Sequence, residues 1–287
     1  MGTGGTLYIV ATPIGNLGDV TLRALEVLRA VPLVAAEDTR VTRRLLDRYE
    51  ITVRTVSYHA QSGPAREREL LAHLGAGDDL ALVTDAGTPV VSDPGEGLVA
   101  AWAAEGGTVV PIPGASSVLA AIAGSGVAGP RWAFEGFLPR SGRDRGDRLA
   151  AIAADERGAV LFEGPNRVAA TLRDLASACG PDRRGAVCRE LTKLHEQIAR
   201  GTLGELATLA DDGTIPARGE VVIVVGWGRG GSTEQARTAA HEDALVAARA
   251  EVEALVAGGV PRGEAARRVA AATRIPRRSL YGTPAGG

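Results

Sequence analysis

The sequence lacks several features that would assign it to a particular class of protein. It contains only two cysteines, Cys179 and Cys188, without metal-ligand spacing, so we expect reduced thiols in a cytoplasmic protein and no metal site. It has no run of about 18 apolar residues, which argues against a membrane-spanning helix. The residues after Met1 show no basic stretch followed by an apolar core, so no secretory signal is expected.

A large excess of one charge is also missing. The chain carries 32 Lys and Arg against 34 Asp and Glu, a formal net charge of −2. A protein that coats nucleic acid without sequence preference needs a strongly basic surface, so this balance argues against that class. It leaves room for docking through local basic patches. The length of 287 residues is enough for two domains, and 45% hydrophobic with 23% charged residues is typical of a soluble globular protein.

Lysine and asparagine are almost absent. Lys193 is the only lysine among the 32 Lys and Arg residues, and Asn16 and Asn166 are the only asparagines. We interpret this skew as drift away from both residue types wherever a substitute works. Each of the three could have survived by chance, but all of them fall in loops or strand ends that resemble site positions.

The first 112 residues alternate between short apolar runs and helical patterns. Alternation of this kind predicts a parallel sheet with helices on both faces. Right-handed crossovers then bring the carboxyl ends of all strands to one edge, so we expect residues 12–16, 37–40, His59 and 85–89 to cluster there. The expected strands are 7–11, 33–36, 52–58, 80–84 and 108–112.

The stretch 80–97 is the most informative part of this pattern. A buried strand ends in Asp85, a Gly/Pro loop follows, and Ser92 or Asp93 before Pro94 predicts the start of a helix. Ligands of open α/β sheets bind beyond the carboxyl ends of the strands, and Gly87 lets the backbone approach a ligand closely. Asp85 therefore either holds a polar or cationic ligand or only caps the turn.

A second α/β domain is expected from residue 113 to 228, with a helical extension over 229–287. Glu163 follows a strand of the second domain much as Asp85 follows one of the first, or is a solvated loop carboxylate. The extension begins with a linker at 228–233 and a long helix at about 233–257. The second-domain strands are expected at 132–137, 159–162, 186–188, 195–201 and 221–225.

Two short helices around a turn, at 261–272 and 276–280, end the chain. Two helices and a turn resemble a helix-turn-helix, which can serve nucleic acid, although a packing appendage with a solvated basic face explains them equally well. Apart from Glu264, the charged residues of this tail are Arg262, Arg267, Arg268, Arg274, Arg277 and Arg278.

Lys193 is the first candidate for a proton acceptor. Lysine can be shifted towards neutrality by burial or by a neighbouring cation such as Arg189, whereas arginine keeps its proton. An ordinary ion-pair lysine is the alternative. Glu37 and Asp38 are runners-up or orienting partners, and Asp38 also fits a helix cap. A histidine at a strand end, such as His59, is more often a hydrogen-bonding loop residue, and we expect His195 to be structural.

Eight motifs in order resemble the ribosomal RNA small subunit methyltransferase I family of the tetrapyrrole methylase superfamily. The likeness runs from about residue 6 to 281, and its first three motifs together are highly specific. The motifs are Leu7–Asn16 (LYIVATPIGN), Ala36–Arg40 (AEDTR), Leu82–Gly95 (LVTDAGTPVVSDPG), Val110–Gly114 (VPIPG), Glu135–Pro139 (EGFLP), Phe162–Arg167 (FEGPNR), Arg189–Lys193 (RELTK) and Gly219–Glu220.

The resemblance implies a two-domain α/β tetrapyrrole-methylase fold (class III methyltransferase), with a parallel N-terminal sheet, a mixed C-terminal sheet and a helical C-terminal extension. It implies a homodimer with S-adenosyl-L-methionine in the cleft between the domains. The implied reaction is 2′-O-methylation of a cytidine ribose in the decoding region of small-subunit ribosomal RNA, on the assembled small ribosomal subunit.

Site residues follow from the matching positions. Lys193 is the expected base, with Glu37 or Asp38 as the alternative, and Arg40, Arg140 and Arg189 are expected to hold RNA phosphates. The chain has Phe162 and Asn166 where family members usually carry Tyr and His, so neither is expected to be catalytic. The expected cofactor-facing residues are Pro13, Gly15, Asn16, Asp85, Ala86, Gly87, Ser116, Phe162 and Glu163.

Three other functions were weighed against this one. A C-methyltransferase of corrin or sirohaem precursors explains the cofactor loops, but not the basic tail or the 36–40 motif. A non-enzymatic nucleotide-sensing or RNA-binding module would bind without releasing S-adenosylhomocysteine. A nicotinamide dehydrogenase is disfavoured, because neither glycine loop of the first domain has the G-x-G-x-x-G spacing.

Overall fold

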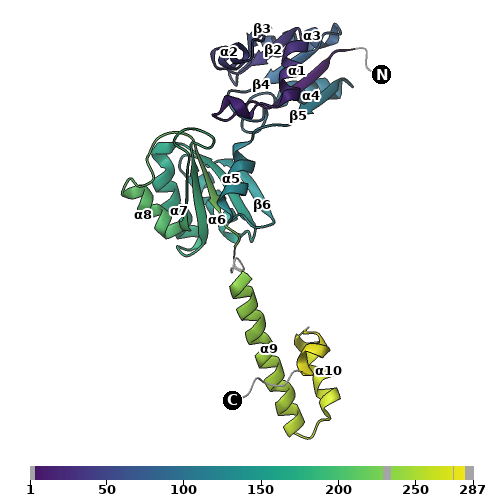
Figure 1. Cartoon of the computed structure of the whole chain (residues 1–287), viewed down its shortest axis with the longest axis vertical. Coiled ribbons are helices and arrows are strands. Elements are labelled where there is room, and N and C mark those ends of the chain that lie inside the picture. The colour runs from purple at the N-terminus through teal and green to yellow at the C-terminus, as the bar shows by residue number, and fades with distance from the viewer. Residues whose placement is uncertain (1–3, 229–233, 274, 282–287) are drawn as a thin grey trace. The chain divides into compact units, whose positions relative to one another are not determined.

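The computed structural model describes residues 4–228, 234–273 and 275–281. The chain forms two compact units, which divide after Gly228 (Figure 1). The further division of the first unit into domains at residue 112 stays a prediction, although its two halves contain one sheet each.

The first sheet is entirely parallel, as predicted. Its strand order is β3-β2-β4-β1-β5, so the central strand β4 lies between β2 and β1. All residues of β2 and β4 are buried, which fits their continuous apolar sequence. The strands are β1 (Thr6–Val10), β2 (Leu33–Ala36), β3 (Arg54–Ser57), β4 (Leu80–Val83) and β5 (Thr108–Ile112).

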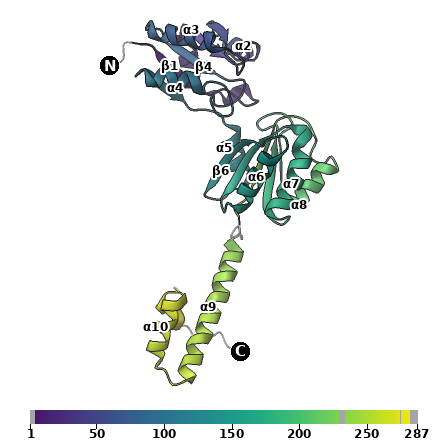
Figure 2. The ribbon, with the colours of Figure 1, turned by 180° about the vertical axis from the view of Figure 1, so that it is seen from behind.

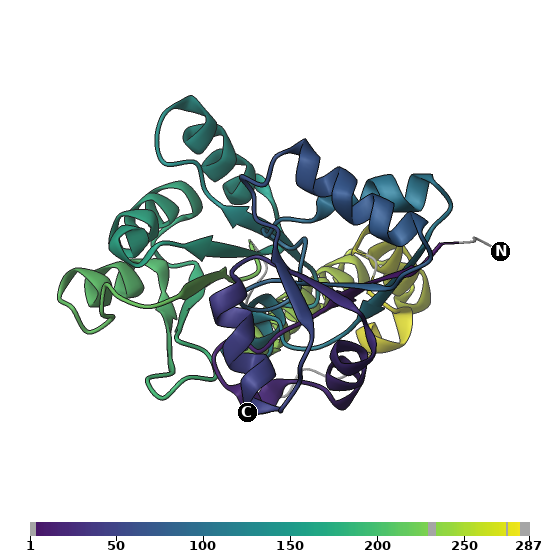
Figure 3. The ribbon, with the colours of Figure 1, turned by 90° about the horizontal axis from the view of Figure 1, so that it is seen from above.

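Two pairs of helices cover the two faces of this sheet (Figure 3). Alternate residues of each strand point to opposite faces, so Val34 and Val83 pack with α1 and α2, while Leu33 and Leu82 pack with α3 and α4. The arginines of α2 at 40, 43, 44 and 48 are exposed, whereas Leu45 and Leu46 are buried. The helices are α1 (Leu22–Ala30), α2 (Thr39–Arg48), α3 (Pro64–Gly75) and α4 (Glu96–Ala104).

The predicted start of α4 is wrong by two residues. The helix begins at Glu96 with Gly95 as its N-cap, at φ 131°, and no side chain caps it. The reason is the backbone before it, because Ser92 adopts a positive φ of 65° and the chain enters the helix only after Pro94. Asp93 is therefore free to face a cavity instead of a helix N-terminus.

The second sheet is mixed, as predicted, with the order β6-β7-β10-β8-β9. β6 and β7 are parallel, and the other three pairs are antiparallel. Its middle strand β10 consists of five buried Val and Ile residues. The strands are β6 (Trp132–Phe137), β7 (Gly158–Glu163), β8 (Arg184–Arg189), β9 (Gln197–Thr202) and β10 (Val221–Val225).

Three helices pack on one face of the second sheet and one on the other. α6 (Arg143–Ala154), α7 (Val168–Cys179) and α8 (Leu203–Asp211) share a core with β7 and β10, whereas α5 (Ser117–Ser125) packs on the opposite face. Ile14, from the loop after β1, joins the α5 core. The first loop of the first sheet therefore lies against the second sheet.

The second unit is a helical hairpin followed by a single 3-10 turn (Figures 1 and 2). α9 (Glu234–Ala257) and α10 (Arg262–Thr273) pack along each other through a core that includes Val252 and Val269. The last described element, η3 (Arg277–Tyr281), lies where the second short helix was expected at 276–280 and is a 3-10 helix. Residues 229–233 of the predicted linker lie outside the described residues, and so does Arg274.

Among the helices that the structure describes, none combines the length and apolarity needed to cross a membrane.

Candidate functional site

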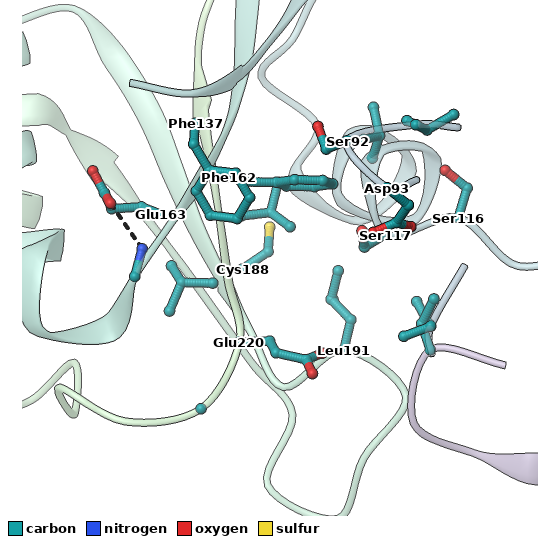
Figure 4. A pocket seen from close by; sticks show the side chains of 18 of the residues that line it. Ser92, Asp93, Ser116, Ser117, Phe137, Phe162, Glu163, Cys188, Leu191 and Glu220 are labelled. Carbon is teal, nitrogen blue, oxygen red and sulfur yellow. Dashed lines mark hydrogen bonds between the residues drawn. The ribbon is translucent and has the colours of Figure 1, made fainter. Parts of the chain in front are cut away.

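A cavity of about 360 Å³ lies where loops of the first sheet face the second sheet (Figure 4). The first sheet contributes Ile14 and the β4–α4 loop, and α5 contributes its N-terminus. The second sheet contributes the carboxyl ends of β6, β7 and β8, the start of β10, and the segments that follow β7 and β8 and precede β10. Ligand pockets commonly start at about 300 Å³, so this cavity is large enough for a small molecule. The lining residues are Ile14, Ala86, Thr88, Val91, Ser92, Asp93, Ser116, Ser117, Val118, Phe137, Phe162, Glu163, Gly164, Pro165, Cys188, Leu191, Gly219, Glu220, Val221 and Val222.

One wall of the cavity is aromatic. The Phe162 ring lies edge-on to Phe134 and to Phe137, with ring centroids 4.9 and 5.5 Å apart. Edge-to-face pairs of this kind fix the rings relative to each other. Figure 4 shows Phe137 and Phe162 on one side of the cavity and Ser92, Asp93 and Ser117 on the other. A flat apolar group fits against the aromatic wall while its polar atoms face the hydroxyls.

The charged residues in the lining all carry carboxyl groups. Asp93, Glu163 and Glu220 line the cavity, and the lining includes no arginine or lysine. Glu163 is already paired, because its fully buried side chain accepts hydrogen bonds from Thr171 Oγ1 (2.6 Å) and the Gly164 amide (2.8 Å) and forms an ion pair with Arg167 (3.2 Å). Glu220 is paired as well, with Lys193 (3.1 Å). Among the described lining residues, Asp93 is thus the carboxyl group without an ion pair, and its negative charge favours a cationic ligand.

Gly87 shapes the loop that carries Ala86 and Thr88. Its amide donates to Thr12 O (3.0 Å) and its carbonyl accepts from Thr12 N (2.8 Å), forming an isolated antiparallel bridge. The φ of Gly87 is 93°, a conformation that side chains with a Cβ rarely adopt. The bridge ties the loops after β1 and β4 together, so both are fixed before any ligand binds.

An acidic cluster lies at the carboxyl ends of β2 and β4, as predicted. Glu37 Oε2 accepts from Thr84 Oγ1 (2.6 Å) and from the Asp85 amide (3.2 Å). Asp85 Oδ1 accepts from the Asp38 amide (2.9 Å). Burial raises the pKa of Asp85, and the nearby carboxylate of Glu37 adds to that effect. Among the described residues, no group of three or more His, Cys, Asp or Glu is arranged to hold a metal ion.

Asp38 faces outward from this cluster. Its side chain caps α2 through the Arg40 amide (2.8 Å) and pairs with the Arg40 guanidinium. The hydrogen bonds from Arg40 lower the pKa of Asp38 to about 2. A carboxyl group with so low a pKa is a weak proton acceptor at neutral pH.

The electrostatic environment of Asp93 is opposite to that of Asp38. Burial raises its pKa to about 6; a hydrogen bond from Thr84 partly opposes the shift, and Glu37 and Asp85 add to it. With a pKa of about 6, the Asp93 carboxyl is mostly ionised at neutral pH.

Lys193 lies in an environment opposite to the predicted one. Its Nζ pairs with Glu190 Oε1 (3.0 Å) and Glu220 Oε2 (3.1 Å) instead of lying beside a cation. Burial alone lowers its pKa, but the hydrogen bonds to both carboxylates outweigh that effect and raise it. Lys193 is thus protonated at neutral pH and orders Glu220 at the cavity wall. Its role in turnover stays a prediction.

Four of the predicted cofactor residues line the cavity, namely Ala86, Ser116, Phe162 and Glu163. Asp85 and Gly87 belong to the same loop but are not among the lining residues. Ser116 also caps α5 by accepting from the Leu119 amide at 3.4 Å.

Pro13, Gly15 and Asn16 flank the cavity without lining it. A Cβ on Gly15 would lie 2.4 Å from Lys193 Cγ, so glycine is needed there for close packing. The exposed Asn16 accepts from the Gly18 amide (3.0 Å) and caps the 3-10 helix η1 (Leu17–Asp19). Gly15 and Asn16 therefore have structural roles that were not predicted from the sequence.

The three arginines predicted to bind RNA phosphates lie in different environments. Arg40 is exposed but paired with Asp38. Arg140 is exposed and lines a second cavity. Arg189 is only 6% exposed, and its guanidinium donates to Gln197 Oε1 (3.2 Å) and His195 O (3.2 Å). Buried and internally bonded, Arg189 does not present a surface for phosphate.

His59 does not join the cluster at the sheet edge. It is exposed, its amide donates to Ser62 Oγ (2.9 Å), and its ring nitrogen accepts from the Gln61 amide (3.2 Å). The histidine therefore organises its own turn, the more frequent role for such a residue.

The cavity residues that sequence reasoning did not assign to the site include Thr88, Asp93, Phe137 and Glu220. All four lie within the quoted motifs, so the motif boundaries pointed to the right segments. Asp93 was assigned to a helix cap because Pro94 follows it. The side-chain direction of Phe137 could not be predicted from strict alternation, because the register of β6 shifts between Phe134 and Gly136.

Comparison with known proteins gives the family. The family described as Tetrapyrrole (Corrin/Porphyrin) Methylases matches residues 6–207. A ribosomal RNA small subunit methyltransferase I from Synechocystis sp. is 47% identical over 277 residues, covering 96% of each chain. The chain belongs to the ribosomal RNA small subunit methyltransferase I family. A second member, from Bacillus subtilis, is 38% identical over 96% of this chain and 93% of its own.

Solved structures of tetrapyrrole methylases share the fold. Cobalt precorrin-4 methyltransferase is 20% identical, covers 77% of this chain and 95% of its own, and superposes with a TM-score of 0.61. Uroporphyrin-III C-methyl transferase from Thermus thermophilus, complexed with S-adenyl homocysteine, is 22% identical over 77% of this chain and 97% of its own, with a TM-score of 0.55. At these identities the likeness shows the fold alone.

Proposed function

We propose that this protein transfers the methyl group of S-adenosyl-L-methionine to the ribose 2′-hydroxyl of a cytidine in the decoding region of small-subunit ribosomal RNA. The proposal includes the assembled small ribosomal subunit as substrate and a homodimer in the cytoplasm as the active form. The observation that carries it is the acidic, aromatic-walled cavity, formed by the same loops that carry the family motifs.

The cavity suits S-adenosyl-L-methionine in chemistry and size. A wall of Phe162 and Val222 suits an adenine ring, and hydroxyls from Thr88, Ser116 and Ser117 suit its polar edge and the ribose. Asp93 complements the cationic end of the molecule. Ala86 and Ser116 would contact it directly, and the loop hydrogen bonds of Asp85, Gly87 and Asn16 with the buried Glu163 network would hold that surface in place.

When bound, this cofactor supplies a methyl group that its sulfonium already activates. The protein then has to align the ribose oxygen with that methyl and accept the hydroxyl proton. Positioning is the larger contribution, at up to about 7–11 kcal/mol, and a base adds roughly 3–5 kcal/mol.

We assign the proton acceptor to Asp93, in place of Lys193, Glu37 or Asp38. Asp93 lines the cavity, and burial raises its pKa to about 6, near the pH at which an acceptor works best. Lys193 holds its proton between two carboxylates, and Asp38 has a pKa of about 2. Glu37 is not among the residues that line the cavity.

A labelled transfer assay tests the function. The protein is incubated with S-adenosyl-L-methionine labelled in its methyl group and with small subunits from cells that lack the gene. Mass spectrometry of the digested RNA should find label in 2′-O-methylcytidine. Label in a base instead, or in a porphyrinoid substrate supplied in parallel but not in RNA, would refute the proposal.

A further inference from the structure

A second cavity, of about 520 Å³, adjoins the first and has the opposite charge. The two cavities share Phe137 and Gly164 in their linings. The acidic cavity has no arginine in its lining, whereas the second one contains three. The lining residues that matter here are Phe137, Arg140, Arg145, Gly164, Arg167 and Asp174.

Two of the three arginines are fixed, and the third is available. Arg145 pairs with Asp174 (2.7 Å) and also donates to Thr171 Oγ1 (2.9 Å). Arg167 pairs with the buried Glu163 (3.2 Å). Arg140 is exposed and forms no hydrogen bond or ion pair within the described ranges. The three guanidinium groups are thus balanced by only two carboxylates, those of Asp174 and Glu163. One positive charge remains available to bind an anion.

The two fixed arginines also hold the segment that carries Phe137. Arg145 donates to Pro139 O (3.0 Å), and Arg167 donates to Leu138 O (3.1 Å) and Pro139 O (3.3 Å). Leu138 itself is buried. The loop from Phe137 to Arg140 therefore starts from a rigid base, which reduces the ordering cost of binding a ligand.

Phe137 is unusually exposed for its type. Its exposed fraction is 59%, and among the exposed large apolar residues that the structure describes it is the one aromatic. Its ring makes an edge-to-face contact with Phe162, so the ring is held in place while part of its surface stays exposed. Aromatic side chains of this kind stack on unpaired nucleobases, and a neighbouring arginine binds the phosphate that follows.

The geometry points to a subsite for single-stranded RNA beside the methyl-donor cavity, in which Phe137 stacks on a nucleobase and Arg140, with Arg145 and Arg167, binds an adjacent phosphate. This inference rests on the proposed function and specifies how the nucleotide next to the target is held. The shared Phe137 and Gly164 place the subsite directly beside the first cavity.

Binding of a short, fluorescently labelled, cytidine-containing single-stranded RNA tests the inference by anisotropy. F137L keeps apolar volume but removes the aromatic face, so it should weaken RNA binding about tenfold, whereas F137W should bind like the wild type. R140A should weaken binding and reduce the salt dependence by about 0.7 in the log–log slope, the value for one phosphate of a single strand. L22A and R68A, at exposed positions on α1 and α3, should have no effect.

Three further measurements separate the outcomes. Calorimetry with S-adenosylhomocysteine should give equal affinities for the wild type and R140A, because Arg140 does not line the donor cavity. A loss of cofactor affinity in F137L as large as its loss of RNA affinity would make Phe137 only a wall of the donor cavity and would contradict the inference. If the site binds only a free anion, excess inorganic phosphate should displace the RNA equally well from the wild type and from F137L. That result would also contradict the inference. Methyl transfer to small subunits is measured separately, so that unchanged RNA binding by F137L and R140A in an active enzyme rejects this subsite alone.

Discussion

Asp93 determines the expected pH dependence of the enzyme. Its carboxyl must be ionised to accept a proton, and burial raises its pKa to about 6. We expect turnover by the wild type to rise as pH increases through about 6 and then to level off. D93N should lose about 100-fold or more in kcat and should lose this inflection. Single-turnover rates across the pH range provide the measurement, and an unchanged profile in D93N would exclude Asp93 as the acceptor.

The same pKa shift has a consequence for stability that does not depend on activity. The folded protein binds a proton at Asp93 more tightly than the unfolded chain, whose carboxyl has the ordinary pKa of 3.8. Stability from this group is therefore present at low pH and is lost as pH rises through about 6. D93N should gain thermal stability over the wild type at pH above this range but not below it. Equal melting temperatures at all pH values would contradict the shifted pKa.

Lys193 is expected to act through its charge. K193R keeps a cation between Glu190 and Glu220 but cannot give up a proton, so we expect turnover within a few-fold of the wild type. K193M leaves the two carboxylates unneutralised and should raise the KM for S-adenosyl-L-methionine. Steady-state kinetics of both variants decide the role. A loss of about 100-fold or more in K193R, with cofactor affinity intact, would restore Lys193 as the base.

At the residue scale, the sequence indicated which segments form the site better than it indicated the role of each residue in it. Lys193 and Asn16, singled out because their residue types are rare, form an ion pair and a turn cap. That these two positions resist substitution stays a prediction. Burial of Asp93 depends on two segments that are distant in sequence, so no local pattern predicts its pKa.

The loop between β4 and α4 depends on two glycines with different requirements. Gly87 needs only a positive φ of 93°, since an added Cβ would meet Ile14 at an ordinary 3.5 Å. Gly95 has a φ of 131°, and its added Cβ would lie 2.6 Å from Leu82 Cδ2. We expect G87A to cost about 1–2 kcal/mol of unfolding free energy, and G95A to cost about 1–3 kcal/mol more through the clash.

Urea unfolding of both variants provides the comparison. G106A serves as a control, because Gly106 has a φ of 77° but no atom within 4 Å of an added Cβ. It should behave like G87A. Equal losses for G87A and G95A would show that Leu82 yields without cost and would contradict the packing described for this loop.

At the element scale, strands were easier to predict than helices. Apolar runs such as 33–36 and 221–225 match β2 and β10. These strands are fully buried and consist of apolar residues, so their bounds can be recognised in the sequence. α7 and α8 were not predicted. α8 carries a complete capping box, in which Thr202 and Glu205 exchange hydrogen bonds, and this was the signal available in the sequence. The start of α4 was misplaced because a positive φ at Ser92 is invisible in the sequence.

At the scale of the whole molecule, the cavity and the helical hairpin belong to separate compact units. Every residue that lines the donor cavity lies before Gly228, and the described hairpin core consists of residues from α9 to η3. A chain that ends at Gly228 should therefore bind S-adenosylhomocysteine with wild-type affinity in calorimetry. We expect it to bind small subunits more weakly and with less salt dependence, because it lacks the basic tail.

A charge reversal in the full chain controls for misfolding of the truncated form. Arg267 and Arg278 are exposed in the hairpin unit, and R267E with R278E should reproduce the loss of subunit affinity without changing cofactor affinity. If the truncated chain and the charge-reversed variant both bind small subunits like the wild type, the extension is only a packing appendage.

The most direct test of this account is a crystal structure of the protein with S-adenosylhomocysteine bound. We predict density for the ligand in the cavity between the two sheets, against Phe162, with Ala86 and Ser116 in contact and Asp93 facing the sulfur end. Density in any other place, or a ligand whose sulfur lies far from Asp93, would contradict the central claim that this cavity binds the methyl donor.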